Sequence, residues 1–70
     1  MAMHTGIVKF FKNESGFGFV VPDDGSTDVF LHVSNWEPKG TYPREGQRVE
    51  FDTVIDRKKG KLTATNCRAA

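Results

Sequence analysis

The chain has 70 residues, of which ten are Lys or Arg and nine are Asp or Glu, so its formal net charge is +1. This length predicts one small domain, with no room for a second domain and little for a deep catalytic cleft. The balanced charge excludes a strongly cationic protein that clamps nucleic acid through a long-range field. Any binding of a polyanion must therefore depend on local patches and on stacking.

Cys67 is the only cysteine, which excludes an internal disulfide and a cysteine zinc cluster. A small domain without such cross-links is typical of a reducing compartment. Residues 1–4 lack the charged start and apolar run of a signal peptide, and no segment approaches the length that spans a membrane. The sequence therefore predicts a cytoplasmic protein without membrane contact, with a flexible terminus at residues 1–4 and a single domain over residues 5–70.

Five β-rich segments follow one another along the chain. The expected strands cover residues 5–12, 15–21, 28–33, 47–54 and 61–67. Residues 22–27 give the strongest turn signal, because Asp-Gly tolerates positive φ and Pro cannot continue a central ladder. No apolar pattern with a 3.6-residue period runs for ten residues, so minimal helix is expected.

Residues 34–46 break the strand pattern with two prolines and two glycines, which predicts a long ordered loop with one helical turn near Ser34. The charged segment 56–60 predicts a hairpin tip. Five short strands in so small a unit favour a closed or nearly closed barrel, which removes edges that would otherwise aggregate. The candidate core side chains are Val8, Val20, Val29, Leu31, Val49, Phe51, Leu62 and Cys67.

The second and third expected strands carry rings on one face and aliphatic side chains on the other. Side chains alternate along a strand, so Phe17 and Phe19 share a face, and Phe30 and His32 share a face. Because the aliphatic face already supplies a core, the ring face needs another explanation. The rings either pack in a core or against another chain, or they form an open platform for unpaired bases. The interleaved glycines favour the platform, since Gly in a strand often marks close approach of a ligand or another backbone.

Taken together, these segments resemble the cold-shock domain family. Residues 6–11 are similar to its opening strand, residues 15–20 to its first ribonucleoprotein motif, and residues 29–32 to its second. Residues 45–51 and 64–67 are similar to its fourth and closing strands, so the resemblance covers nearly the whole chain. It implies an all-β fold, a five-stranded antiparallel OB-fold barrel, which binds single-stranded RNA and DNA across the second and third strands. RNA-recognition motifs also contain Gly-Phe-Gly-Phe-Val, but their fold needs two helices.

The resemblance also assigns candidate binding residues. Those on the family's nucleic-acid-binding positions are Lys9, Phe10, Phe17, Phe19, Phe30 and His32. Phe11 is the alternative to Phe10 as the outward ring. Trp36 and Tyr42 either extend the platform or cap the open end of the barrel. Lys59 lies in a basic segment that is either a solvated hairpin or a contact for nucleic acid.

The chain departs from the family pattern at several positions. Phe10 stands where Trp is usual, Ser15 where Lys is usual, and Val33 where Phe is usual. Trp36 replaces an aliphatic residue, and the loop around Tyr42 is slightly shorter than the common pattern. These differences predict binding that is weaker or differently spaced than in a typical member.

No catalytic or metal-binding constellation is evident in the sequence. His32 has no nucleophile partner, the Asp23-Asp24 pair serves a turn, and His4 lacks further ligands. The sequence predicts no enzyme, no cofactor and no metal. The predicted function is passive binding of single-stranded RNA and DNA by a monomer, which acts as an ATP-independent RNA chaperone or as a regulator of transcription or translation. The alternative is a small barrel whose ring face contacts a protein.

Overall fold

Six strands and one short 3₁₀ helix make up the regular structure in residues 4–37, 39–58 and 60–70, which are the residues that the computed structural model describes. The elements are β1 (His4–Lys12), β2 (Phe17–Pro22), β3 (Val29–His32), η1 (Val33–Asn35), β4 (Trp36–Glu37), β5 (Arg48–Asp56) and β6 (Lys61–Ala69). The strands β1, β2, β3, β5 and β6 correspond to the five expected strands. The helical turn near Ser34 is confirmed by η1, whereas the two-residue β4 was not expected.

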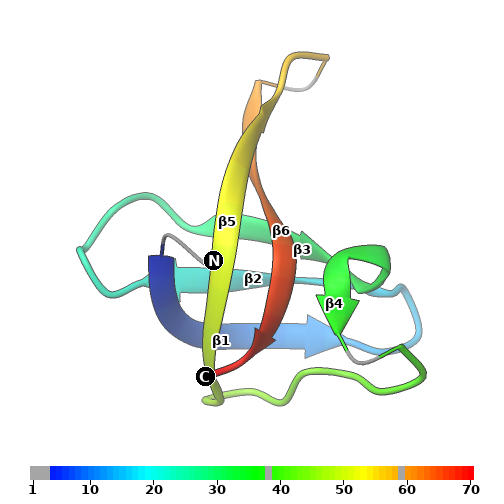
Figure 1. The fold of residues 1–70 in the computed structure, drawn as a ribbon. Coiled ribbons are helices and arrows are strands. Elements are labelled where there is room, and N and C mark those ends of the chain that lie inside the picture. The colour runs from blue at the N-terminus through cyan, green and yellow to red at the C-terminus, as the bar shows by residue number, and fades with distance from the viewer. Residues whose placement is uncertain (1–3, 38, 59) are drawn as a thin grey trace.

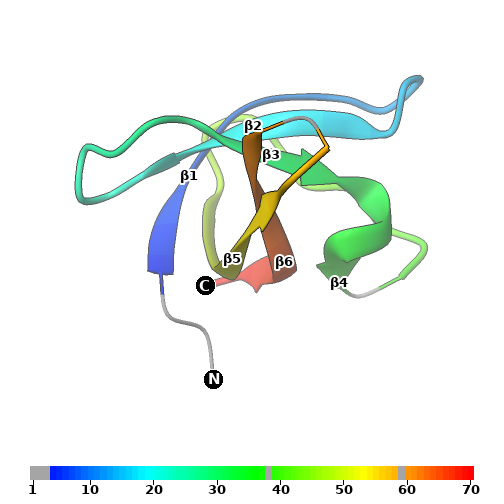
Figure 2. The same ribbon diagram turned by 90° about the horizontal axis from the view of Figure 1, so that it is seen from above.

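β1 is shared between the two halves of the sheet. It pairs antiparallel with β2 along most of its length and with β5 through its first four residues. β3 pairs with β2, and β6 pairs with β5. One parallel pairing, between Phe30 and Thr63, joins β3 to β6 and closes the barrel. Figures 1 and 2 show β1, β2 and β3 as one layer that lies across the β5–β6 hairpin. The predicted all-β barrel is confirmed.

The β5–β6 hairpin is longer than the sequence suggested. β5 continues to Asp56 and β6 to Ala69, and the tip of the hairpin projects beyond the barrel (Figure 1).

Near the N-terminus, the prediction that His4 belongs to a flexible terminus is wrong. His4 is the first residue of β1, and its ring stacks on Phe51 with the centroids 5.8 Å apart. The rest of that predicted terminus, residues 1–3, lies outside the described residues.

The core lies between the two layers and consists of small and medium aliphatic side chains around Phe51. Its buried members are Val8, Val20, Val29, Leu31, Trp36, Val49, Phe51, Ala64 and Cys67. Of the predicted core, only Leu62 is partly rather than fully buried. Burial raises the pKa of the Cys67 thiol to about 12, so this cysteine behaves as a small apolar side chain.

Trp36 closes one end of the barrel. Its side chain is 3% exposed, and β4 pairs it in parallel with Cys67 of β6. The indole N–H donates to Thr41 Oγ1 at 2.9 Å, which satisfies the polar end of the ring where the long loop passes. The alternative that Trp36 extends the platform is therefore wrong, because its ring is buried and has no free face for a base.

Asp23 fixes the loop between β2 and β3 to the barrel wall. Its carboxylate accepts from Thr5 Oγ1 at 2.6 Å and from the Arg48 guanidinium at 2.8 Å. The Thr5 hydroxyl and the Arg48 guanidinium hold the pKa of Asp23 below its ordinary value. Because β1, the loop and β5 meet at this carboxylate, the loop has a defined place beside the sheet.

Trp36→Ala should destabilise the fold by about 3–5 kcal/mol, because it removes a buried ring and leaves a cavity. The measurement is urea unfolding followed by far-ultraviolet circular dichroism. Tyr42→Ala is the matched control: Tyr42 lies in the same loop region, but its side chain is 48% exposed, so the expected loss is below about 1 kcal/mol. Similar small losses in both variants would show that Trp36 is not part of the core.

Candidate nucleic-acid interface

A β-bulge in β1 decides which of two adjacent rings faces outward. Val8 points into the core and pairs with Val20 of β2. The neighbouring residue of β2, Phe19, pairs with Phe10 and not with Lys9, so the register shifts by one residue at Lys9. Strict alternation would turn Phe10 to the same side as Val8. With the bulge, Phe10 lies beside Phe19, while Phe11 packs against the core cluster. Of the two alternatives in the sequence, Phe10 is the outward ring.

Gly18 permits the close approach of the bulged strand. A Cβ at this position would overlap the carbonyl oxygen of Phe10 and lie 2.8 Å from the Cα of Phe11. Gly18 is itself buried and lies on the core side of β2. The glycine between the two rings of β2 therefore marks the approach of another backbone, and it is not evidence for a ligand.

Four phenyl rings form a continuous row on the outward face, and we call it the ring row: Phe10, Phe19, Phe30 and Phe17. The centroids of Phe10 and Phe19 are 5.6 Å apart and those of Phe19 and Phe30 are 5.7 Å apart. Phe17 stacks on Phe30 at 5.7 Å with 25° between the planes. All four side chains are half-buried. Each ring is thus held by its neighbours while part of its surface stays open to solvent.

His32 lies at the Phe17 end of the ring row. It pairs with Phe17 across β2 and β3, so both side chains are on the outward face. Its side chain is exposed, and its Nδ1 accepts the backbone N–H of Ser34 at the start of η1 with an N–N distance of 3.1 Å. This hydrogen bond fixes the imidazole ring at the edge of the row.

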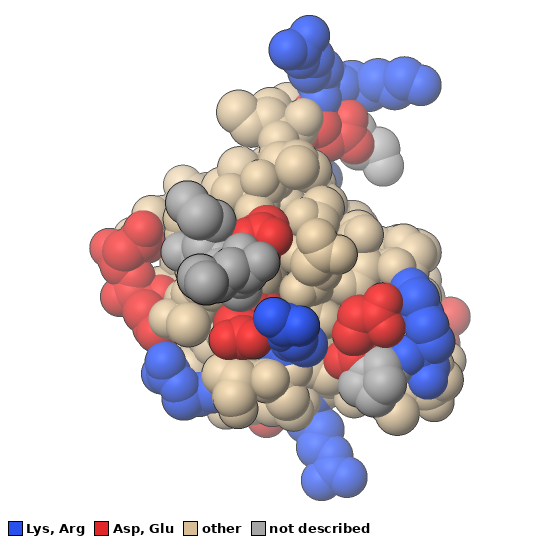
Figure 3. Space-filling view, viewed as in Figure 1, with Lys and Arg blue, Asp and Glu red and all other residues tan. Residues whose placement is uncertain are grey.

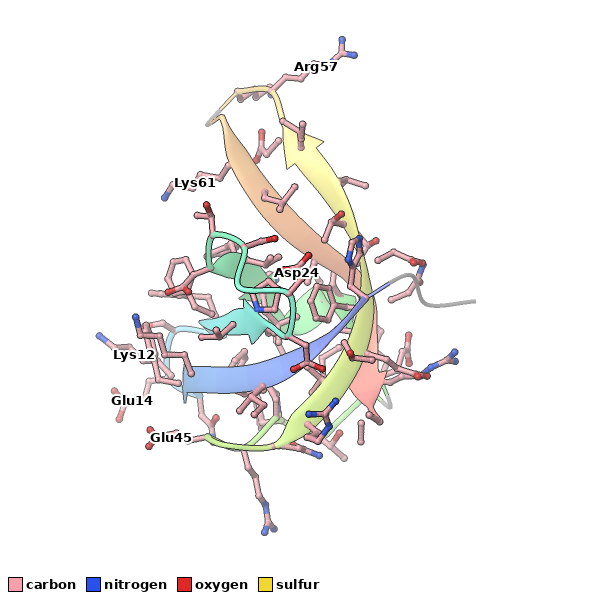
Figure 4. The ribbon with its side chains drawn as sticks, turned by 90° about the vertical axis from the view of Figure 1, so that its left-hand side faces the viewer. Lys12, Glu14, Asp24, Glu45, Arg57 and Lys61 are labelled. Carbon is pink, nitrogen blue, oxygen red and sulfur yellow. The ribbon has the colours of Figure 1, made fainter. Side chains whose placement is uncertain are left out.

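Among the described residues, few cations lie near the ring row, and one of them is neutralised by an ion pair. Lys9, at the bulge, forms an ion pair with Asp28, with 3.1 Å between Nζ and Oδ2, and the two side chains are 56% and 37% exposed. Lys12 pairs with Phe17 across β1 and β2, which places it on the outward face. Figure 4 shows Lys12 and Lys61 extending to the side of the molecule away from β5. On the face over β5 and β6, Figure 3 shows basic and acidic side chains intermixed.

Tyr42, another of the predicted site residues, does not join the ring row. Tyr42 packs against Phe11, with 6.0 Å between the ring centroids, and Phe11 belongs to the core side of β1. Tyr42 is exposed, but it is separate from the four rings. Lys59 lies outside the described residues.

The structure adds residues that the sequence did not connect with the rings. Thr63 of β6 pairs with Phe30 of β3, and Lys61 lies two residues before Thr63 on the same face. The parallel contact joins strands that are far apart in the chain, so no local pattern could have indicated it. A groove between the hairpin and the sheet is lined by Phe19, Thr27, Asp28, Phe30, Gly60, Lys61 and Leu62.

Comparison with known proteins agrees with this arrangement. The model of the 'Cold-shock' DNA-binding domain family matches residues 4–70. The chain belongs to this family. It is 52% identical over 69 residues to cold shock protein CspA of Rhizobium meliloti, with 97% of this chain and 100% of that protein covered. It is 49% identical over 53 residues to the cold shock-like protein CspE of Escherichia coli K12, with 74% and 77% covered.

The fold of this cold-shock domain also occurs in a solved structure. Part of the Drosophila protein described as Unr CSD456 superposes with a TM-score of 0.78, at 19% sequence identity, over 96% of this chain and 26% of that one. At this identity the likeness concerns the fold alone, and it agrees with the OB-fold expected from the family. In the part of the chain that the structure describes, no helix is long and apolar enough to cross a membrane.

The ion pair between Lys9 and Asp28 should limit what Lys9 contributes to binding nucleic acid. Asp28→Asn removes a negative charge beside the ring row and releases the ammonium group, so it should tighten binding of an oligothymidylate about two- to fivefold at low salt. The gain should vanish near 1 M salt, where charges are screened within about 3 Å. Fluorescence anisotropy of a labelled oligonucleotide measures both effects.

Glu50→Gln is the matched control for this change. Glu50 forms an ion pair with Arg68 between β5 and β6, with 2.7 Å between the charged atoms. The substitution changes the net charge by the same amount away from the rings, so it should have a smaller effect. Weaker binding by Asp28→Asn would contradict the prediction and indicate that the carboxylate itself contacts the ligand.

Proposed function

We propose that this cold-shock domain protein binds single-stranded RNA and DNA by stacking unpaired bases on the ring row. The observation that carries the proposal is a continuous row of four half-buried rings on a face that the core does not use. Membership of a nucleic-acid-binding family supports it. Every base has a π-face, so such a surface accepts successive bases with little regard to sequence.

Stacking also favours single strands over duplexes. In a duplex the faces of the bases are covered by their neighbours, whereas a single strand can turn them toward the protein. Lys9, Lys12 and Lys61 lie around the ring row, where an ammonium group can contact the phosphates between stacked bases. The rings supply most of the affinity in this mechanism, and the cations position the backbone.

We propose further that the protein acts as an RNA chaperone without ATP. A protein that binds the open form of an RNA and not its folded form shifts the equilibrium toward the open form by mass action. The same preference gives a route to regulating transcription or translation. We propose that the protein acts as a monomer in the cytoplasm. Cys67 is a free thiol in the core, and free thiols are typical of a reducing compartment.

Replacing Phe17, Phe19 or Phe30 singly with Ala should weaken binding of an oligothymidylate or an unstructured RNA by about 1–3 kcal/mol each, because a stacking surface is lost. The loss in folding stability should be smaller than the 3–5 kcal/mol typical of a buried ring. Anisotropy titration measures binding, and urea unfolding of the same variants measures stability.

Phe10→Ala and Phe11→Ala form a matched pair for the same test. The two rings are adjacent in β1, but only Phe10 belongs to the ring row, while Phe11 packs against the core. Phe10→Ala should mainly weaken binding, and Phe11→Ala should mainly lower stability. If the wild-type protein binds no single strand while retaining its fold, the proposal fails and the ring row becomes a candidate surface for a protein partner.

Affinity should decrease only modestly with salt. Each neutralised phosphate contributes about −0.7 to the slope of log K against log salt on a single strand, so three contacts predict a slope of about −2. Titrations between low and moderate salt give this slope, and Lys12→Gln should make it shallower by about 0.7. A slope of about −4 or steeper in the wild type indicates six or more phosphate contacts and contradicts a mechanism led by stacking.

A further inference from the structure

The β5–β6 hairpin extends the outward face beyond the ring row. Phe30 and Thr63 are opposite one another in the parallel pairing, so their side chains lie on the same side of the sheet. Lys61 is two residues before Thr63, and Asp56 is its partner across the hairpin. Phe30, Thr63, Lys61 and Asp56 therefore belong to one surface, although they come from three strands.

These four residues line a hollow beside the ring of Phe30. Its volume is about 90 Å³, several times the 10–15 Å³ that one water molecule needs. A second hollow of about 320 Å³ shares Phe30 and Lys61 and continues past Phe19 and Asp28. A base that stacks on Phe30 thus has space to place its polar edge against the hairpin.

The polar groups of the hollow combine a donor with acceptors. Lys61 carries an ammonium group, which only donates, and the Thr63 hydroxyl donates or accepts. The carboxylate of Asp56 accepts the backbone N–H of Lys58 at 3.0 Å through Oδ1. A carboxylate has about four lone-pair sites on its two oxygens, so it can hold the hairpin turn and also accept from a ligand.

Guanine presents the complementary pattern. Its O6 and N7 accept, and an ammonium group that contacts them is a common means of recognising this base. Its N1–H and N2 amino group are adjacent donors, which a carboxylate can accept in two parallel bonds. Adenine has an amino group in place of O6, and the pyrimidines lack the pair of adjacent donors. The combination of Lys61 and Asp56 beside an exposed ring therefore favours guanine.

We infer that the hollow between Phe30 and the β5–β6 hairpin is a guanine-selective subsite, in which Lys61 binds O6 or N7 and Asp56 accepts from N1–H and the N2 amino group. The inference rests on the proposed function, since it requires a single strand stacked on the ring row. It adds a sequence preference to a surface that is otherwise tolerant of sequence.

The test is anisotropy titration of labelled heptamers. One is all thymidine, and in the others a single guanine, hypoxanthine or adenine replaces thymine at each position in turn. Guanine should tighten binding about tenfold at one or two positions, as expected for one good bidentate contact. Hypoxanthine keeps O6 and N1–H but lacks the N2 amino group, so its gain should be smaller, and adenine should give none.

Three variants locate the effect on the hairpin. Asp56→Asn keeps an oxygen for the Lys58 N–H but replaces an acceptor with a donor, so it should abolish the guanine gain, which is the ratio of the affinities for the guanine-containing and all-thymidine heptamers. Because it also removes a negative charge beside Phe30, binding of the all-thymidine heptamer should tighten slightly at low salt. Lys61→Met should reduce the gain as well. Lys58→Met is the matched control, because it changes the charge equally at the exposed hairpin tip, outside both hollows, and it should preserve the gain.

Each outcome bears on one claim. Equal affinities for guanine, hypoxanthine and adenine at every position would overturn the subsite while leaving single-strand binding intact. A guanine preference that persists unchanged in Asp56→Asn would also overturn it, because the recognition would then lie elsewhere. Failure of the folded wild-type protein to bind any heptamer would instead overturn the proposed function, and the subsite with it.

Discussion

The close contact between the bulged part of β1 and Gly18 determines how the two faces of the sheet are used. Because the register shifts at Lys9, β1 contributes Val8 to the core and Phe10 to the outward face within three residues. The shift brings the backbone of β1 against β2 so closely that any side chain at position 18 would collide with it. The ring row exists in its full length only because this position is glycine and the strand is bulged.

A second consequence is that the core and the ring row consist of different side chains. The core is complete without the ring row, since Phe51, Trp36 and the buried aliphatic residues fill the barrel. Trp36 is the clearest case, because its indole closes the barrel end and its N–H is satisfied by Thr41. The outward rings stabilise one another through their mutual contacts, each worth about 0.5–1.5 kcal/mol beyond burial. Their remaining surface is free to bind a ligand without cost to the core.

The sequence allowed the outward rings of β2 and β3 to be predicted, because a period of two assigns Phe17, Phe19, Phe30 and His32 to one face. It left Phe10 and Phe11 open, since a bulge breaks the period and no residue pattern marks it unambiguously. The burial of Trp36 depends on β4, a two-residue strand that forms only through its parallel contact with β6. Likewise, the place of Lys61 beside Phe30 depends on the β3–β6 pairing. In each case the missing information is a contact between distant segments, which local periodicity cannot contain.

Ion pairs on the surface weaken the electrostatic attraction of the protein for a polyanion. Three exposed ion pairs, Lys9–Asp28, Arg48–Asp23 and Arg68–Glu50, neutralise cations around the barrel, and such pairs contribute little to stability. Their larger effect is to keep the field of a chain with net charge +1 weak, so that a polyanion is not attracted strongly to any face. In the proposed mechanism the rings, whose stacking depends little on salt, therefore decide where a strand binds. The inferred guanine subsite depends on the same condition: the contribution of a single cation and a single carboxylate beside Phe30 is measurable only where phosphate contacts do not dominate the affinity.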